Sequence, residues 1–251
     1  MSGGGVYSLA TKGAKDVIDI ATPLVLDAVD SITADGLRSG FTLSDMGCAD
    51  GGTSFYREIL PPGTLHLGFS ATAMHWLSAK PGDISNHVHM VGATGQELDA
   101  FRAHAHADWR RILLNRASEL KSGGKLVLVN FCIDEEGRYL GNTGGVNMFD
   151  TFNQIWLDFL QQGRIGRDEY RSMALPQFYN TAAEFSAPLE DPDDPVYGSG
   201  KRKHLLQRLV AAKRRRRAPG ADRGILFDLR AAGAESARGT WHGLRPRLHG
   251  D

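Results

Sequence analysis

The sequence predicts an α/β fold built on a parallel sheet, and three observations support this. The run KLVLVNF at residues 125–131 is β-rich and apolar, and it is entered through Ser122-Gly123-Gly124. Residues 98–120 before it carry apolar side chains at i, i+3 and i+4 spacing, which is one face of a helix. Two further apolar runs, 41–46 and 64–70, read as buried strands. Alternating helices and strands are typical of a parallel sheet.

The N-terminal third predicts two helical stretches before the first strand. Residues 6–20 read as a short entry followed by a helix, and residues 24–32 continue a helical apolar pattern. Pro23 fits a helix start, because its missing N–H has no partner there anyway.

The third quarter of the chain predicts two more helices and a break. Residues 146–162 form an amphipathic helix with a large apolar face: Met148, Phe152, Ile155, Trp156 and Phe159. Core packing is the ordinary explanation of that face, and the wall of an aromatic substrate pocket is the functional alternative. Thr181 and Glu184 fit a capping box, so a helix should start near Thr181. Residues 188–200 are rich in Pro, Gly and Asp and read as a linker.

Composition narrows the class of protein. The chain has 251 residues, of which 41% are hydrophobic, enough for a sizeable core. No apolar run approaches the ~20 residues of a membrane span, and residues 1–10 lack the pattern of a secretory signal. Cys48 and Cys132 fit neither a disulfide framework nor a zinc spacing. We therefore expect a cytoplasmic protein with no membrane partner.

The balanced net charge hides a split. Residues 1–200 hold 15 Lys and Arg against 25 Asp and Glu, whereas residues 201–251 hold 14 against 4. The leading explanation of the basic part is a misassembled C-terminus. The ordinary alternative is a solvated helix over residues 201–217. Nucleic acid is not expected as a partner, because no aromatic residues are interleaved from 201 to 226. Residues 224–229 fit a late strand.

A glycine-rich loop follows the first predicted strand. Asp45 to Gly51 has the form D-x-G-x-A-x-G, which allows the backbone to turn sharply and approach a ligand. The spacing does not fit the G-x-G-x-x-G of dinucleotide sites. It is closer to the acidic, glycine-rich loop of methyltransferases, and a plain strand-to-helix turn explains it equally well.

The next stretch is more specific. Residues 54–78 read SFYREILPPGTLHLGFSATAMHWLS. This resembles the SFY-x-x-LFP-x-x-SLH-x-x-x-S-x-x-x-x-HWLS segment of the SABATH carboxyl methyltransferases, and we expect a bacterial-type member. Residues 45–48 (DMGC) resemble the family's DLGC, and residues 119–128 resemble its EL-x-x-GG-x-MVL strand. The resemblance is strong over residues 41–130.

The resemblance implies a Rossmann-like methyltransferase sheet with a partial helical cap. It also implies methyl transfer from S-adenosylmethionine to the carboxylate or ring nitrogen of a small molecule. A carboxylate is already a nucleophile at pH 7, so catalysis is mostly positioning and we assign no catalytic residue. By resemblance the substrate-binding residues are His75 and Trp76, which supply N–H donors. The alternative for Trp76 is a core aromatic.

The cofactor residues also follow from the resemblance. Asp45, Gly47 and Cys48 would line the methionine and ribose end. Ser54 and Phe55 would lie against the adenine, and Ser70 near the sulfonium. A small-molecule carboxylic acid is the expected partner, with a homodimer as an option.

The chain departs from the family in the middle. Only eighteen positions, 47–64, separate the first two strands, whereas a βαβ unit takes ~30 residues. The family's intervening strands and its ribose-binding acid are therefore missing, through a deletion or a misjoined gene. The sheet should be truncated, with strand 41–46 at its edge beside strand 64–70. The family's N-terminal Gln has Lys15 or Asp16 in its place.

The division of the chain follows from these patterns. We expect an incomplete methyltransferase domain at 1–187, a linker at 188–200 and a divergent basic tail at 201–251. We expect no metal site. His104 and His106 would not face each other on a helix, and His87-x-His89 has no evident third ligand. The alternative function is a non-catalytic methyltransferase-like remnant whose basic tail mediates an interaction.

Overall fold

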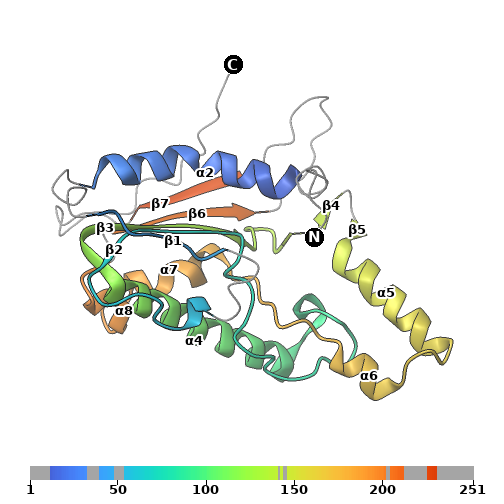
Figure 1. The fold of residues 1–251 in the computed structure, drawn as a ribbon. Coiled ribbons are helices and arrows are strands. Elements are labelled where there is room, and N and C mark those ends of the chain that lie inside the picture. Colours follow the sequence, from blue (N-terminus) through green and yellow to red (C-terminus); the bar gives the residue numbers. More distant parts are fainter. Residues whose placement is uncertain are drawn as a thin grey trace.

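A five-stranded sheet organises the molecule (Figure 1). The computed structural model describes residues 12–32, 40–47, 54–140, 142–143, 146–201, 204–211 and 225–230. The strand order is β1-β2-β3-β6-β7. The first four strands run parallel and β7 is antiparallel to β6. Their bounds are Leu43–Asp45, Leu65–Ala71, Leu120–Cys132, Leu205–Ala211 and Ile225–Arg230. The predicted α/β fold and its three N-terminal strands are confirmed.

One face of the sheet is covered by helix α2, Lys12–Asp30 (Figure 1). Leu24 and Ala28 of α2 pack against Leu67 and Val127 of the sheet. The prediction of two helices with Pro23 at a start is wrong, because Pro23 lies inside one continuous helix. A proline inside a helix removes one backbone hydrogen bond, and burial of the apolar stripe on the sheet offsets that loss.

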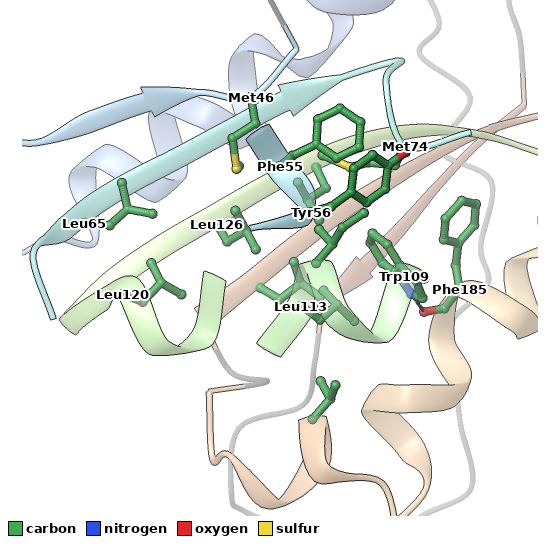
Figure 2. Close-up of a cluster of buried hydrophobic side chains, with 14 of the residues drawn as sticks. Met46, Phe55, Tyr56, Leu65, Met74, Trp109, Leu113, Leu120, Leu126 and Phe185 are labelled. Carbon is green, nitrogen blue, oxygen red and sulfur yellow. Dashed lines mark hydrogen bonds between the residues drawn. The ribbon is translucent and has the colours of Figure 1, made fainter. Parts of the chain in front are cut away.

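The opposite face is covered by helices α4 (Gly95–Glu119), α7 (Ala182–Glu190) and α8 (Pro195–Gly198). Figure 2 shows the core between these layers, where Trp109 and Leu113 of α4 meet Leu126 of β3. The Trp109 indole N–H donates to the Phe185 carbonyl of α7 at 3.0 Å. The predicted apolar face of α4 is confirmed, as is the capping box at the start of α7.

Strand β1 forms the edge of the sheet. It pairs with β2 alone, with Leu43 opposite Leu67 and Asp45 opposite Phe69. In the part of the chain that the structure describes, no strand lies beyond β1. The prediction that this strand pairs with the 64–70 strand and lies at the edge is confirmed. An edge strand leaves a row of backbone N–H and C=O groups unpaired on one side.

The C-terminal part differs from the predicted linker and tail. Residues 188–200 contain the end of α7 and all of α8, and Val196 is buried there. Asp194 caps α8 and pairs with Arg110 of α4 at 2.7 Å. Residues 205–211 form β6 beside β3 instead of a helix, so residue 200 does not separate two structural units. The late strand is confirmed as β7, and most of the Arg-rich run lies outside the described residues.

The remaining elements lie at the carboxyl end of the sheet or away from it. Helices α5 (Met148–Gln161) and α6 (Arg167–Ser172) lie away from the sheet (Figure 1). The short elements are η1 (Ser54–Tyr56), η2 (Met90–Gly92), β4 (Asn142–Thr143) and β5 (Val146–Asn147). Over the described residues, no helix has both the length and the apolar content that a bilayer crossing needs.

Candidate functional site

The carboxyl ends of β1 and β2 meet at one place. The Met46 N–H donates to the Phe69 carbonyl at 2.8 Å, which keeps the chain after β1 beside the end of β2. A Cβ added at Gly47 would lie 3.3 Å from the Ala71 carbonyl oxygen, so glycine permits this close approach. Ligands of open α/β sheets bind outside the carboxyl ends of the strands, and these two ends define such an edge.

Asp45 shapes the turn at this edge. Its Oδ1 accepts from the Gly47 N–H at 2.9 Å, and the residue is exposed. The carboxylate therefore lies at the surface while the turn is fixed by a local hydrogen bond. Cys48, the third residue expected here, lies outside the described residues, as does the side chain of Ser54.

Phe55 and Ser70 are both more buried than ligand-facing groups usually are. The Phe55 ring is 8% exposed and lies 4.3 Å from the Tyr56 ring, within the core of Figure 2. Ser70 is 0% exposed, and its Oγ has no hydrogen-bond partner among the described residues. A buried hydroxyl without a partner is costly, by about 1–3 kcal/mol, so this group would gain from a polar neighbour.

Residues 75–78 form a turn that presents an indole. Trp76 is 43% exposed, which rules out the alternative of a core aromatic and leaves the indole accessible to a ligand. The backbone of the turn is nevertheless fixed. The Leu77 N–H donates to the Pro176 carbonyl at 2.8 Å, and the Ser78 N–H donates to Asp108 of α4 at 2.7 Å.

His75 lies behind this indole as a neutral ring. It stacks on Tyr179 with ring centroids 5.3 Å apart, and burial lowers the pKa of His75 to about 4. Its Nδ1 is buried and has no hydrogen-bond partner in the described part of the chain. A neutral imidazole keeps one N–H donor. His75 and Trp76 can thus offer two donors without adding a charge.

A buried ion pair on α4 holds the segment that follows η1. The Arg116 and Glu119 side chains are 0% exposed and meet at 2.6 Å. Arg116 donates to the Arg57 carbonyl at 2.6 Å, and Glu119 accepts from the Ile59 N–H at 2.6 Å. Sequence reasoning placed Arg116 on the apolar face of the helix but missed this pair, for which its position among apolar residues was the only signal.

The exposed face of α5 corrects the core-packing explanation. Met148, Phe152 and Ile155 are 38%, 43% and 46% exposed, so they do not pack in the core. Phe149 on the same helix is buried, and its ring stacks on His89. The rings of His75, Tyr179, Phe149 and Phe152 follow one another at centroid distances of 5.3, 6.2 and 6.2 Å. A row of aromatic rings, buried except for Phe152, therefore connects the 75–78 turn to α5.

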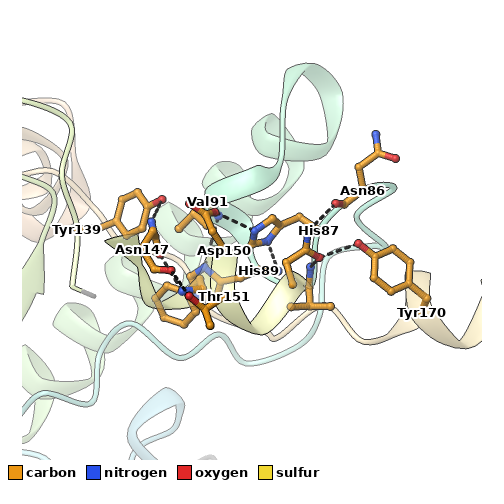
Figure 3. A network of polar contacts seen from close by, with 12 residues as sticks. Asn86, His87, His89, Val91, Tyr139, Asn147, Asp150, Thr151 and Tyr170 are labelled. Atoms are coloured by element: carbon orange, nitrogen blue, oxygen red, sulfur yellow. Dashed lines mark hydrogen bonds and ion pairs between the residues drawn. The ribbon is translucent and has the colours of Figure 1, made fainter. Parts of the chain in front are cut away.

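The first histidine pair takes part in a protein network, shown in Figure 3. His87 Nδ1 accepts from the His89 N–H at 3.0 Å, and its Nε2 lies 3.2 Å from Asp150. His89 Nε2 lies 3.0 Å from Gln177 Oε1. Over the described residues, no group of three His, Cys, Asp or Glu side chains is arranged to hold a metal ion.

Of the second histidine pair, His104 contacts the 75–78 turn and His106 points elsewhere. His104 Nε2 lies 3.0 Å from Ser78 Oγ and 3.3 Å from Asp108, while Ser78 Oγ donates to Asp108 at 2.8 Å. One ring nitrogen faces both partners, so the three residues do not form the relay of a Ser-His-Asp triad. His106 points to Glu184 at 3.4 Å instead.

The described residues thus combine a parallel sheet, a glycine turn at its carboxyl edge and two neutral donors near that edge. A family model described as SAM dependent carboxyl methyltransferase matches residues 51–193, more than half of the chain. This chain belongs to that family, and the SABATH resemblance is confirmed.

Individual relatives agree. Methyltransferase FUS9 of Gibberella fujikuroi is 28% identical over 159 residues, which cover 63% of this chain and 41% of FUS9. Indole-3-acetate O-methyltransferase 1 of Arabidopsis thaliana is 27% identical over 182 residues, covering 67% of this chain and 45% of that protein. Farnesoic acid carboxyl-O-methyltransferase of the same plant is 27% identical over 154 residues, covering 55% and 42%.

Among solved structures, loganic acid methyltransferase with SAH matches at a TM-score of 0.48 and 22% identity, covering 54% of this chain and 41% of that one. The chain spans less than half the length of the curated relatives it matches.

Proposed function

We propose that this chain binds S-adenosylmethionine and transfers its methyl group to the carboxylate of a small organic acid, with weak cofactor affinity. The observation that carries the proposal is the 75–78 turn. Its backbone is fixed from two sides, yet the Trp76 indole is 43% exposed and accessible to a ligand. A pre-positioned donor on an exposed aromatic suits the recognition of a carboxylate.

The residues at the sheet edge fit the methionine end of the cofactor. Asp45 offers an exposed carboxylate to an ammonium group, and Gly47 allows close backbone approach. The unpartnered Ser70 Oγ would gain a polar neighbour. When bound, the cofactor would supply a methyl group on a positively charged sulfur. We keep Cys48, Ser54 and Phe55 in the proposed cofactor set on the strength of the family resemblance.

The part of the proposed cofactor site that would hold the adenosine has less support. The segment of the family that carries the ribose-binding acid is missing from this sequence, and β1 is the sheet edge in the described residues. A hydrogen bond to a charged group contributes about 1.5–3 kcal/mol, so its loss weakens binding roughly ten- to a hundredfold. The proposed acceptor is an acid with an apolar body, which the exposed Trp76 indole favours.

Calorimetry with S-adenosylhomocysteine on the purified chain tests the cofactor, and methyl incorporation from labelled cofactor into a panel of aromatic and aliphatic acids tests the reaction. Binding with slow transfer to at least one acid is the expected result. Binding without transfer to any acid favours the alternative of a non-catalytic remnant. Absence of binding at millimolar ligand refutes the proposal.

Two further points belong to the proposal. We propose a cytoplasmic location, because the sequence positions of Cys48 and Cys132 fit no disulfide framework. We also propose a homodimer as the assembly, since the edge strand β1 offers unpaired backbone groups to a second copy. We expect no nucleic acid as a partner.

A further inference from the structure

Tyr56 lies between the two segments that the proposed function uses. The first is η1, Ser54–Tyr56, which we call the cofactor segment, and the second is the acceptor turn, residues 75–78. Tyr56 is 6% exposed and belongs to the same core cluster as Phe55 and Met74 (Figure 2). Its hydroxyl donates to the Trp76 carbonyl at 2.6 Å. One side chain of the cofactor segment therefore reaches the backbone of the acceptor turn directly.

The hydroxyl remains a donor over the whole physiological pH range. Burial, with a smaller effect from the Asp108 carboxylate, raises the pKa of Tyr56 far above its ordinary value. The Trp76 carbonyl therefore always faces a protonated phenol. The contact joins a buried residue of the cofactor segment to the indole-bearing residue of the acceptor turn.

Helix α4 holds the surroundings of this contact still. Asn115 donates to the Tyr56 carbonyl at 2.9 Å and Arg116 to the Phe55 carbonyl at 3.3 Å. Farther along the same helix, Asp108 accepts from the Ser78 N–H at 2.7 Å and from the Ser78 hydroxyl at 2.8 Å. Both segments are thus held by helix α4. A displacement of the cofactor segment would be transmitted to Trp76 through the Tyr56 hydrogen bond.

We propose that Tyr56 is a positioning residue that couples the two halves of the site, so that filling the cofactor site further restricts local opening of the acceptor turn and tightens acceptor binding. This inference rests on the proposed function. Coupling requires a physical connection whose arrangement both ligands bias, and the Tyr56–Trp76 hydrogen bond supplies it. Because such coupling is reciprocal, a bound acceptor would tighten cofactor binding by the same factor.

Hydrogen exchange measures the coupling without an identified acceptor. The amides of Leu77 and Ser78 are reporters, since they donate to Pro176 and Asp108. In the unmodified chain, saturating S-adenosylhomocysteine should slow their exchange about fivefold. In Tyr56→Phe, which keeps the ring, S-adenosylhomocysteine should still bind with an affinity within about threefold, but the added protection should disappear.

Tyr170→Phe is the matched control. Tyr170 is likewise buried, and its hydroxyl donates to Asn153 Oδ1 at 2.7 Å, but it lies on α6. This variant should keep the cofactor-induced protection in full. Equal protection in Tyr56→Phe and in the unmodified chain would overturn the coupling while leaving the proposed function intact.

Two results obtained with the unmodified chain can refute the coupling even if Tyr56→Phe does not fold. Binding of S-adenosylhomocysteine without any change at Leu77 and Ser78 refutes the coupling alone. No binding at all refutes the coupling together with the proposed function. Where an acid is found to be methylated, Tyr56→Phe should raise the KM for that acid about fivefold with a smaller effect on the KM for the cofactor.

Discussion

Replacing Glu119 with alanine should destabilise the chain far more than the loss of an exposed helix charge would. Its side chain and that of Arg116 are 0% exposed, with 2.6 Å between Oε1 and Nη2. The same Oε1 accepts from the Ile59 N–H at 2.6 Å and the Leu60 N–H at 3.3 Å. Glu119→Ala therefore leaves a buried guanidinium without its counter-charge and two amides without an acceptor.

The expected loss follows from these contacts. Breaking a buried ion pair by removing one partner costs about 3–5 kcal/mol. Arg116 keeps its hydrogen bonds to the Phe55 and Arg57 carbonyls, which favours the lower half of that range. Urea unfolding at pH 7 should show a midpoint lowered by about 1 M or more, for a slope of 1–3 kcal/mol per M.

A matched control separates burial from ion pairing. Lys80 and Asp83 are also three residues apart and meet at 2.6 Å, but their side chains are 31% and 47% exposed. Asp83→Ala should cost less than about 1 kcal/mol. The double variant Arg116→Met with Glu119→Leu should recover much of the loss, because it removes both charges. A loss below about 1 kcal/mol in Glu119→Ala would refute the reasoning.

Three further predictions concern the indole, the buried histidines and the α7 cap. Trp76→Ala should reduce methyl transfer at least tenfold and leave S-adenosylhomocysteine affinity nearly unchanged; equal loss of both in calorimetry would make Trp76 a structural residue. Burial lowers the pKa of His75 to about 4 and of His89 to about 3. The unfolded state then binds protons that the folded state does not, so stability should fall as pH drops from about 6.5 toward 4. The loss at pH 5 is about 2 kcal/mol per histidine, and a flat unfolding free energy between pH 7 and 5 would contradict it. Thr181→Ala removes a cap in which Thr181 Oγ1 accepts from the Glu184 N–H, and thermal unfolding should show a loss of about 1 kcal/mol.

The sequence predicted the central elements because their apolar residues form regular or uninterrupted patterns. The apolar face of residues 98–120 became α4 with its buried side inward, and the run 125–131 became the middle of β3. The capping box at Thr181 rests on a local hydrogen-bond pattern that needs no tertiary context. These are the cases in which local propensity and global packing agree.

The errors arose where tertiary packing outweighed local signals. Pro23 argued for a helix start, but the stripe of α2 gains more from covering the sheet than the helix loses at one hydrogen bond. The basic composition of residues 201–217 suggested a solvated helix. Residues 205–211 instead form strand β6, which pairs in parallel with β3. The Arg116–Glu119 pair could not be read from spacing, because i, i+3 charges are usually exposed.

The two halves of the candidate site have unequal support, and this suggests where function is limited. The acceptor turn is tied to α4 through Asp108, to η1 through Tyr56 and to the segment before α7 through Pro176. The glycine turn after Asp45 follows a strand that pairs with β2, and in the described residues no strand lies on the other side of β1. A rigid acceptor side keeps the geometry of transfer, whereas a loosely held cofactor turn lowers the fraction of time in which that geometry is filled. Under the proposed function, cofactor occupancy would limit the reaction, and methyl transfer should respond to cofactor concentrations well above those that saturate a relative with the ribose-binding acid.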